Sequence, residues 1–161
     1  MKKIFCALLS FVMIFSLFTF DTFAVSEAET APYVIDFTLS SANDFSVASN
    51  ETRVSGLILT YALSIQKSGT SIVIKGKTGC SNDVVKCGFK NLTVERRKSS
   101  SSSWSDYYDY GDYYVESTLA TVSTTLSVAS GYQYRVTCKH YAKKNLLLTE
   151  NISNASAVLT M

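Results

Sequence analysis

The sequence predicts an all-β protein in which about seven strands form a two-sheet antiparallel sandwich. Segments of alternating apolar and polar residues recur after residue 56, as expected for strands with one buried face. Gly, Ser and Asn cluster between these segments, as in turns, and the only proline of the chain is Pro32. No segment in this part has the periodicity of an amphipathic helix. This combination is typical of a sandwich.

The clearest strand pattern runs from Tyr132 to His140. Every second residue there is Tyr, Tyr, Val, Cys or His, whereas the residues between them are Gln, Arg, Thr and Lys. Leu126 precedes Tyr132 by six residues, and Ser130-Gly131 provides a bend. This spacing is similar to the tyrosine corner of immunoglobulin-like and fibronectin type III sandwiches. It therefore favours a sandwich of that kind.

The N-terminus has the pattern of a secretory signal peptide. A positive start, Met1-Lys2-Lys3, precedes an apolar run that extends from Ile4 to Phe20. Small residues at Thr22-Phe23-Ala24 then predict cleavage after Ala24. We expect residues 1–24 to be a helical leader, with an uncleaved membrane anchor as the alternative.

Residues 25–55 are polar and rich in small side chains, which is typical of a flexible N-terminal arm. The short apolar patch 33–37 is a candidate strand that docks on the sheet. The β-sandwich domain is expected over residues 56–161, a length that suits one domain.

The first two strands of that domain are expected on either side of a turn at residues 67–70. The first has apolar residues of one parity, namely Leu57, Leu59, Tyr61, Leu63 and Ile65. The second strand is predicted to turn Ile72, Ile74 and Cys80 inward. Its lysines, Lys75 and Lys77, are predicted to face outward.

The third strand, expected over residues 86–97, contains an irregularity. Cys87 and Phe89 have one parity, whereas Leu92 and Val94 have the other. A β-bulge between Phe89 and Leu92 would place all four on one face. A soluble loop is predicted at residues 99–103.

Three further strands are expected in the C-terminal half besides the one at Tyr132–His140. The Thr/Ser-rich section 116–125 suits a strand with little side-chain bulk. The run Leu146–Leu148 is expected to begin another strand, and residues 155–161 are expected to form the last one.

As an ordered set, several short motifs of this domain resemble a family of proteins. They are Tyr61-x3-Ile65-x-Lys67-x-Gly69, Ile72-x-Ile74, Lys86-Cys87-Gly88-Phe89, Leu92-x-Val94, Trp104, Gly131-Tyr132-x-Tyr134-Arg135-Val136, His140-Tyr141-Ala142, Thr149-Glu150 and Ser156-Ala157-Val158. The chain is similar, over about residues 56–161, to small secreted proteins of Gram-positive, largely clostridial bacteria with an immunoglobulin-like domain of unknown function. The resemblance implies an extracellular sandwich and no catalytic residues. The cysteines depart from the family's pattern.

The charge of the expected mature chain argues against two classes of partner. Removing Lys2, Lys3 and Asp21 from the 15 basic and 13 acidic residues leaves 13 and 12, a net charge of +1. Such a balance favours neither nucleic acid nor an anionic membrane surface. No second apolar run of spanning length follows the leader. We therefore expect no nucleic-acid partner and, after cleavage, no membrane partner.

Three cysteines follow the leader: Cys80, Cys87 and Cys138. In a fibronectin-like strand order, the start of the third strand lies near the end of the Tyr132–His140 strand. This places Cys87 near Cys138 as the first candidate disulfide. A Cys80–Cys87 bond and three free thiols remain alternatives. The spacing Cys-x6-Cys lacks a second pair and the chain has one histidine, so no metal site or other cofactor is expected.

Catalytic chemistry has little basis in this sequence. His140 is the only histidine, and no nucleophile-elbow pattern accompanies it. Its ordinary interpretation is a histidine in a strand, so we expect no enzyme. Three aspartates recur at every third position, namely Asp106, Asp109 and Asp112. An EF-hand calcium loop instead places its oxygen ligands at alternate positions, so this spacing is compatible only with an ion bound at the surface.

The strongest functional signal is an aromatic cluster between residues 104 and 114. Exposed aromatic rings bordered by acids stack on sugars or anchor protein partners, whereas buried ones only pack. The candidate ligand-binding residues are Trp104, Tyr107, Tyr108, Tyr110 and Tyr113.

The function expected from these patterns is non-catalytic binding of a protein or cell-envelope ligand outside the cell. The alternative is a carbohydrate-binding module that uses the aromatic surface from Trp104 to Tyr114. A flat row of exposed rings would favour sugar. A buried or irregular set would favour packing or protein contact.

Overall fold

The computed structural model describes residues 31–32, 34–41 and 52–161. The expected leader and its cleavage site after Ala24 lie outside these residues. Within them the chain forms ten strands and no helix: β1 (Val34–Ser40), β2 (Thr52–Arg53), β3 (Ile58–Ser68), β4 (Ser71–Cys80), β5 (Lys86–Arg97), β6 (Ser105–Val115), β7 (Leu119–Ser127), β8 (Gln133–Lys143), β9 (Thr149–Ala155) and β10 (Leu159–Thr160). This part of the chain therefore includes no segment able to cross a bilayer as a helix.

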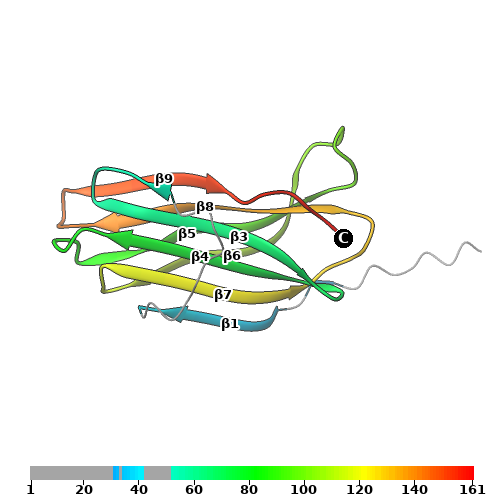
Figure 1. Ribbon diagram of the computed structural model, residues 1–161, viewed down its shortest axis with the longest axis horizontal. Coiled ribbons are helices and arrows are strands. Elements are labelled where there is room, and N and C mark those ends of the chain that lie inside the picture. Colours follow the sequence, from blue (N-terminus) through cyan, green and yellow to red (C-terminus); the bar gives the residue numbers. More distant parts are fainter. Residues whose placement is uncertain (1–30, 33, 42–51) are drawn as a thin grey trace, which may run out of the picture.

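The strands form two antiparallel sheets that face each other (Figure 1). The first sheet has the order β1-β7-β4-β3-β2. The second has the order β10-β8-β5-β6, and β9 pairs with β8 along the same edge as β10. The prediction of an all-β antiparallel sandwich is confirmed. The additional strands are β1, which comes from the expected N-terminal arm and docks on β7, the two-residue edge strand β2, and β6, which the aromatic stretch forms and which was not expected as a strand.

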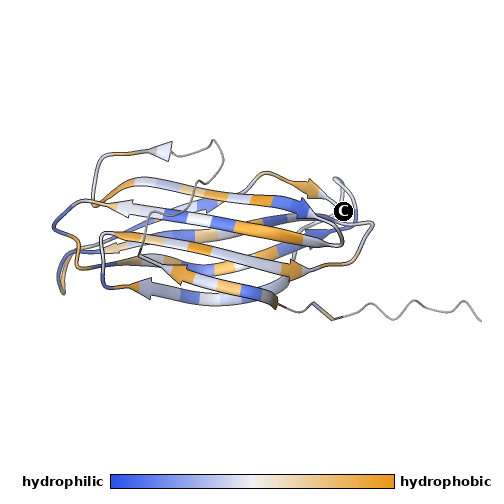
Figure 2. Ribbon diagram, turned by 60° about the horizontal axis from the view of Figure 1, so that its bottom comes forward, coloured by the Kyte–Doolittle hydropathy of each residue, from blue (hydrophilic) through white to orange (hydrophobic). Residues whose placement is uncertain are grey.

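The core lies between the sheets because each strand turns alternate residues inward, and Figure 2 shows this alternation of apolar and polar residues along the strands. The largest fully buried apolar side chains come from both sheets: Tyr134, Phe89, Ile58, Ile72, Ile74, Leu92 and Leu126. On β4 the buried residues Ile72 and Ile74 alternate with partly exposed ones, and Lys75 and Lys77 lie on the outward face, as predicted.

The predicted bulge of β5 is confirmed. Its pairing with β6 shifts register between Phe89 and Leu92, and its pairing with β8 shifts between Lys90 and Thr93. Asn91 lies inside this bulge with a φ of 49°. The extra residue restores the parity, so that Cys87, Phe89, Leu92 and Val94 are all completely buried.

A second bulge, in β3, was not expected. The pairing of β3 with β4 shifts register between Ile58 and Thr60. Ile58 is therefore fully buried, whereas Leu59 is 41% exposed, and the predicted uniform parity from Leu57 to Ile65 is wrong at its start.

The tyrosine corner is present, but on a different tyrosine. The hydroxyl of Tyr134 donates a hydrogen bond to the carbonyl of Ala129 at 2.8 Å, across the bend that joins β7 to β8. The prediction from the spacing between Leu126 and Tyr132 is therefore off by two residues. Tyr134 is fully buried, and its burial raises the pKa of the phenol to about 12.

Two predictions near the C-terminus are wrong. Leu146–Leu148 does not begin a strand, because these residues form an exposed turn between β8 and β9. Residues 155–161 are not one strand either, since Ala155 ends β9 and only Leu159–Thr160 pairs further along β8.

Candidate functional site

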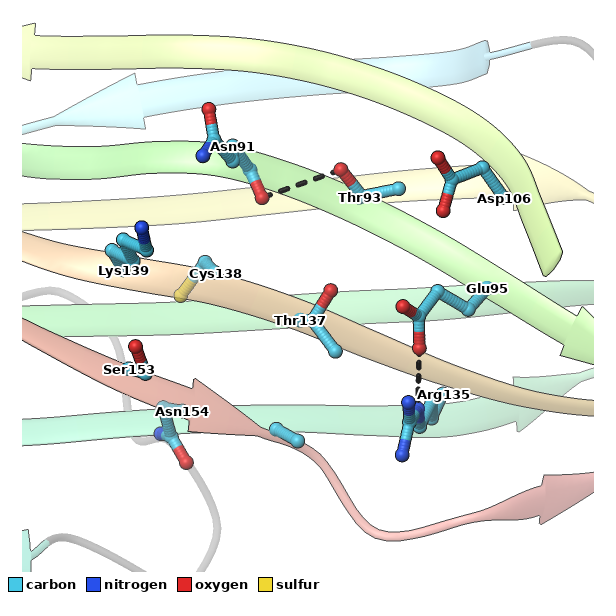
Figure 3. Close-up of a pocket in the computed structure, with 11 residues that line it drawn as sticks. Asn91, Thr93, Glu95, Asp106, Arg135, Thr137, Cys138, Lys139, Ser153 and Asn154 are labelled. Atoms are coloured by element: carbon cyan, nitrogen blue, oxygen red, sulfur yellow. Dashed lines mark hydrogen bonds and ion pairs between the residues drawn. The ribbon is translucent and has the colours of Figure 1, made fainter. Parts of the chain in front are cut away.

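The outer face of the second sheet carries a surface groove. This groove has a volume of about 560 Å³ and runs across β6, β5, β8 and β9 (Figure 3). It is lined by Asn91, Thr93, Glu95, Asp106, Arg135, Thr137, Cys138, Lys139, Ser153, Asn154 and Ala155.

The strand register explains why polar residues gather there. Residues paired directly across antiparallel strands point to the same face. Glu95 of β5 is paired with Arg135 of β8 and with Asp106 of β6, and Glu95 and Arg135 form an ion pair. Thr93 likewise faces Thr137. The groove therefore presents both charges and hydroxyl groups to solvent.

Trp104 lies beside this groove, immediately before β6. The guanidinium groups of Arg97 and Arg135 lie over its ring, at 4.3 Å and 4.4 Å from the centroid. Nε of Arg97 also donates a hydrogen bond of 2.8 Å to Oε1 of Gln133. These contacts hold the indole against the outer face of the sheet.

A second aromatic group lies towards the other end of the same face. The rings of Tyr114 and Tyr141 meet edge to face, with centroids 5.0 Å apart. Lys86 lies over the Tyr114 ring, and Lys90 lies over the Tyr141 ring. The Tyr114 hydroxyl donates a 2.8 Å hydrogen bond to Asp112, and desolvation together with this carboxylate raises the pKa of Tyr114.

The four predicted tyrosines of the aromatic cluster face inward instead. Tyr107, Tyr108, Tyr110 and Tyr113 are partly buried and pack against the core. Phe37 of β1 contacts Tyr113 with ring centroids 4.5 Å apart, which fills the space between the sheets.

Individual contacts show how closely these rings are packed. The ring centroid of Tyr107 is 5.4 Å from that of Tyr134, and the Tyr110 hydroxyl is 3.1 Å from that of Thr124. Burial raises the pKa of Tyr110 to about 12. A flat row of exposed rings is therefore not formed by these residues.

Sequence reasoning missed the outward-facing partners of Trp104. The alternation along β8 already predicted that Arg135 faces away from the core, but nothing local to Trp104 indicated which arginines it would meet. Tyr114 belongs to the predicted aromatic surface, but its contact with Tyr141 was missed because this contact depends on β6 and β8 flanking β5.

His140 is fully buried in a polar cluster of the core. Its Nδ1 lies 2.7 Å from the Thr78 hydroxyl, and its Nε2 lies 3.2 Å from Nδ2 of Asn154 and 3.7 Å from Sγ of Cys138. Burial lowers the pKa of His140 to about 3 and raises that of Cys138 to about 12. A neutral imidazole beside a protonated thiol is the arrangement of a packed core.

The predicted Cys87–Cys138 pairing is contradicted by the strand register. Cys87 faces Ala142 on β8, which lies four residues beyond Cys138. At about 3.3 Å per residue this separation far exceeds the reach of a disulfide. Cys80 instead packs against the core cluster that contains Cys87, and the interaction of the two thiols raises the pKa of Cys80 and lowers that of Cys87. All three cysteines are free.

Two of the three aspartates of the 106–112 stretch, Asp109 and Asp112, accept hydrogen bonds from backbone amides, whereas Asp106 lines the groove. Oδ1 of Asp112 accepts the amide of Asn91 at 2.8 Å, and this hydrogen bond lowers the pKa of Asp112. Oδ1 of Asp109 accepts the amide of Gly111 at 2.9 Å. Among residues 31–32, 34–41 and 52–161, no three His, Cys, Asp or Glu side chains are grouped to hold a metal ion.

Comparisons of the chain with protein families, with curated proteins and with solved structures found no match.

Proposed function

We propose that this protein is a secreted, non-catalytic binding module whose outer face on the second sheet recognises a protein or cell-envelope ligand outside the cell. The observation that carries the proposal is Trp104, held under Arg97 and Arg135 at the rim of a polar groove. Trp, Tyr and Arg dominate the binding energy of protein interfaces, and their side chains are effective when already positioned. This face offers all three residue types.

A protein ligand accounts for this face better than a sugar does. Stacking of a sugar needs an open aromatic face, whereas the Trp104 ring already has two guanidinium groups over it. The tyrosines that the carbohydrate alternative requires pack against the core. A protein ligand with exposed carboxylates can bind the outer sides of Arg97 and Arg135 without displacing them.

The extracellular location and the immunoglobulin-like relationship belong to the same proposal. Export is supported by the leader pattern of residues 1–24. The immunoglobulin-like relationship is supported by the facing orders β3-β4-β7 and β6-β5-β8, and by the Tyr134 corner. Similarity to the secreted clostridial proteins fits both.

The test is binding of the fluorescently labelled chain from residue 25 to intact cells of the organism that produces it. Every core residue in the described part of the chain follows this starting point. We expect saturable binding that is lost when the cells are first treated with protease. Trp104→Ala should weaken it by at least about tenfold, as expected for an aromatic residue that dominates the binding energy.

Lys67→Ala is the matched control, because Lys67 is exposed near the β3–β4 turn of the other sheet. It should bind like the wild type. A glycan array probed in parallel should give no signal. Protease-resistant binding with a glycan signal that depends on Trp104 would establish the carbohydrate alternative, and unchanged binding by Trp104→Ala would remove this face as the site.

A further inference from the structure

The turn between β8 and β9 displays three consecutive leucines to solvent. Leu146 is 89% exposed, Leu147 97% and Leu148 47%. Val85, whose amide donates a 2.9 Å hydrogen bond to the carbonyl of Lys143, is a further apolar neighbour and is 57% exposed. Single exposed leucines are common, but such a projecting group indicates an interaction site. We propose that this leucine turn, residues 145–148, inserts into the surface of a lipid bilayer.

The backbone of the leucine turn is suited to apolar surroundings. Oδ1 of Asn145 accepts the amides of Leu147 and Leu148, at 3.0 Å and 2.9 Å. The amide of Lys144 donates a 3.0 Å hydrogen bond to the carbonyl of Leu148 and closes the turn. A polar backbone group without a partner is costly in hydrocarbon, so these internal bonds lower the cost of insertion.

The position of the turn favours a bilayer over a flat protein surface. The β8–β9 connection lies at one tip of the elongated sandwich, at the end away from the C-terminus (Figure 1). A narrow convex tip buries little area against a flat partner, but it fits between lipid headgroups. The side chains of Leu146 and Leu147 are also too exposed to contribute much to the stability of the fold.

Basic residues lie directly behind the leucines, at the level that headgroups would occupy. Lys143 ends β8 and is paired with Lys86 of β5. Lys144 is engaged by Asp83 in an ion pair, and Glu116 follows β6 at the same end, so the excess of positive charge is small. Insertion is therefore driven mainly by the leucines, with a modest gain from anionic lipids.

Binding of this kind is weak and reversible, since even a whole acyl chain gives only marginal attachment. The small net charge and the lack of a second apolar run of spanning length predicted no membrane partner after cleavage. A four-residue turn escapes both criteria, because it changes neither the net charge nor the long apolar runs.

The test is co-sedimentation of the chain from residue 25 with vesicles of phosphatidylcholine, alone or mixed equally with phosphatidylglycerol. Wild type should bind both, and the mixed vesicles somewhat better. Leu146→Ser combined with Leu147→Ser should weaken partitioning by about tenfold or more, because two leucine side chains no longer leave water. Val158→Ser, a 49% exposed apolar residue outside the turn, is the matched control and should bind like wild type.

A second readout locates the turn. Leu147→Trp in a Trp104→Phe background should give an indole emission that shifts to the blue only when vesicles are added. Absence of wild-type binding to both vesicles, or equal binding by the leucine variant, would overturn the proposal. Leucine-dependent dimers, or leucine-dependent and protease-sensitive cell binding without vesicle binding, would assign the turn to a protein contact instead. Trp104→Ala should leave vesicle binding unchanged, so this proposal and the proposed function fail separately.

Discussion

The hydroxyl oxygen of Thr78 lies 2.7 Å from Nδ1 of His140, and this contact determines the tautomer of the only histidine. Thr78 has one hydroxyl proton, which it donates to the carbonyl of Gly88 at 3.1 Å. Nδ1 of His140 must therefore carry a proton and donate it to Thr78. Nε2 is left as an acceptor for the amide group of Asn154. The neutral ring thus satisfies polar groups on both sheets.

The first prediction concerns the pH dependence of stability. The pKa of His140 is lowered by burial from 6.5 to about 3, so between these values the unfolded chain binds a proton that the folded chain does not. The free energy of unfolding contributed by His140 is complete above pH 6.5 and falls as the pH drops, by at most about 1.4 kcal/mol per pH unit. Urea unfolding at several pH values between about 6.5 and 4.5 measures this slope. His140→Gln, which cannot titrate, should show a clearly shallower slope; equal slopes would contradict a neutral buried ring.

The second prediction tests the tyrosine corner. Tyr134→Phe removes the hydroxyl that donates to the carbonyl of Ala129, and should lower the free energy of unfolding by about 1 kcal/mol. Tyr132→Phe keeps the ring of the other tyrosine and should have little effect. Urea denaturation of both variants compares them directly. A larger loss for Tyr132→Phe would restore the assignment made from spacing.

How far the sequence predicts the structure depends on how local each feature is. The bulge in β5 was predicted because two apolar pairs of opposite parity, Cys87 with Phe89 and Leu92 with Val94, must share one core. The bulge in β3 left no such conflict, since Leu57 and Leu59 continue the parity of Tyr61. A run of apolar residues such as Leu146–Leu148 has no parity at all, and it indicated a strand where the chain forms a turn.

The candidate site was less predictable than the fold for the same reason. An aromatic cluster in one strand does not specify which rings face the core, because the bulge-like shifts of β6 against β5 decide it. The contacts of Trp104 with Arg97 and Arg135 join three separate segments of the chain. Likewise, placing Cys87 requires the register of β5 against β8, which a strand order alone does not provide.

The third prediction concerns Asn91 in the β5 bulge. Its φ of 49° is a left-handed conformation, which asparagine tolerates better than most residues and glycine better still. Asn91→Ala should cost about 1 kcal/mol of stability, whereas Asn91→Gly should be nearly neutral. Asn91 is exposed, so neither change opens a cavity. Thermal or urea unfolding that ranks alanine equal to or above glycine would contradict the bulge geometry.

The fourth prediction concerns Gly88, where β5 and β6 approach closely. A Cβ atom at this position would lie 2.0 Å from the carbonyl oxygen of Tyr113, which belongs to the backbone and cannot rotate away. Gly88→Ala should therefore destabilise the protein by at least about 3 kcal/mol or prevent folding. Gly131→Ala is the control, because φ is 80° there and nothing lies within 4 Å of the added atom, so only about 1 kcal/mol of backbone strain is expected. Soluble yield and urea unfolding compare the two; equal costs would mean that the strands lie further apart.

The last prediction is that oxidation joins Cys80 to Cys87 and leaves Cys138 as a thiol. The thiols of Cys80 and Cys87 interact, which lowers the pKa of Cys87 and raises that of Cys80. Cys80 is the partly exposed thiol of the pair, so with added oxidised glutathione it loses its proton, attacks one sulfur and releases a glutathione thiolate. The buried Cys87 thiolate then attacks the mixed disulfide at Cys80 and releases the second glutathione.

Mass spectrometry of proteolytic fragments should therefore find one fragment pair linked through Cys80 and Cys87, and an alkylatable Cys138 in the unfolded chain. Cys87→Ala should stop at the glutathione adduct of Cys80, whereas Cys138→Ala should oxidise like wild type. By loop entropy, closing so short a segment adds about 2.5 kcal/mol to the free energy of unfolding, which urea denaturation of oxidised and reduced protein can measure. A Cys87–Cys138 linkage would contradict the register of β5 on β8, because Cys87 is paired with Ala142, four positions further along β8 than Cys138.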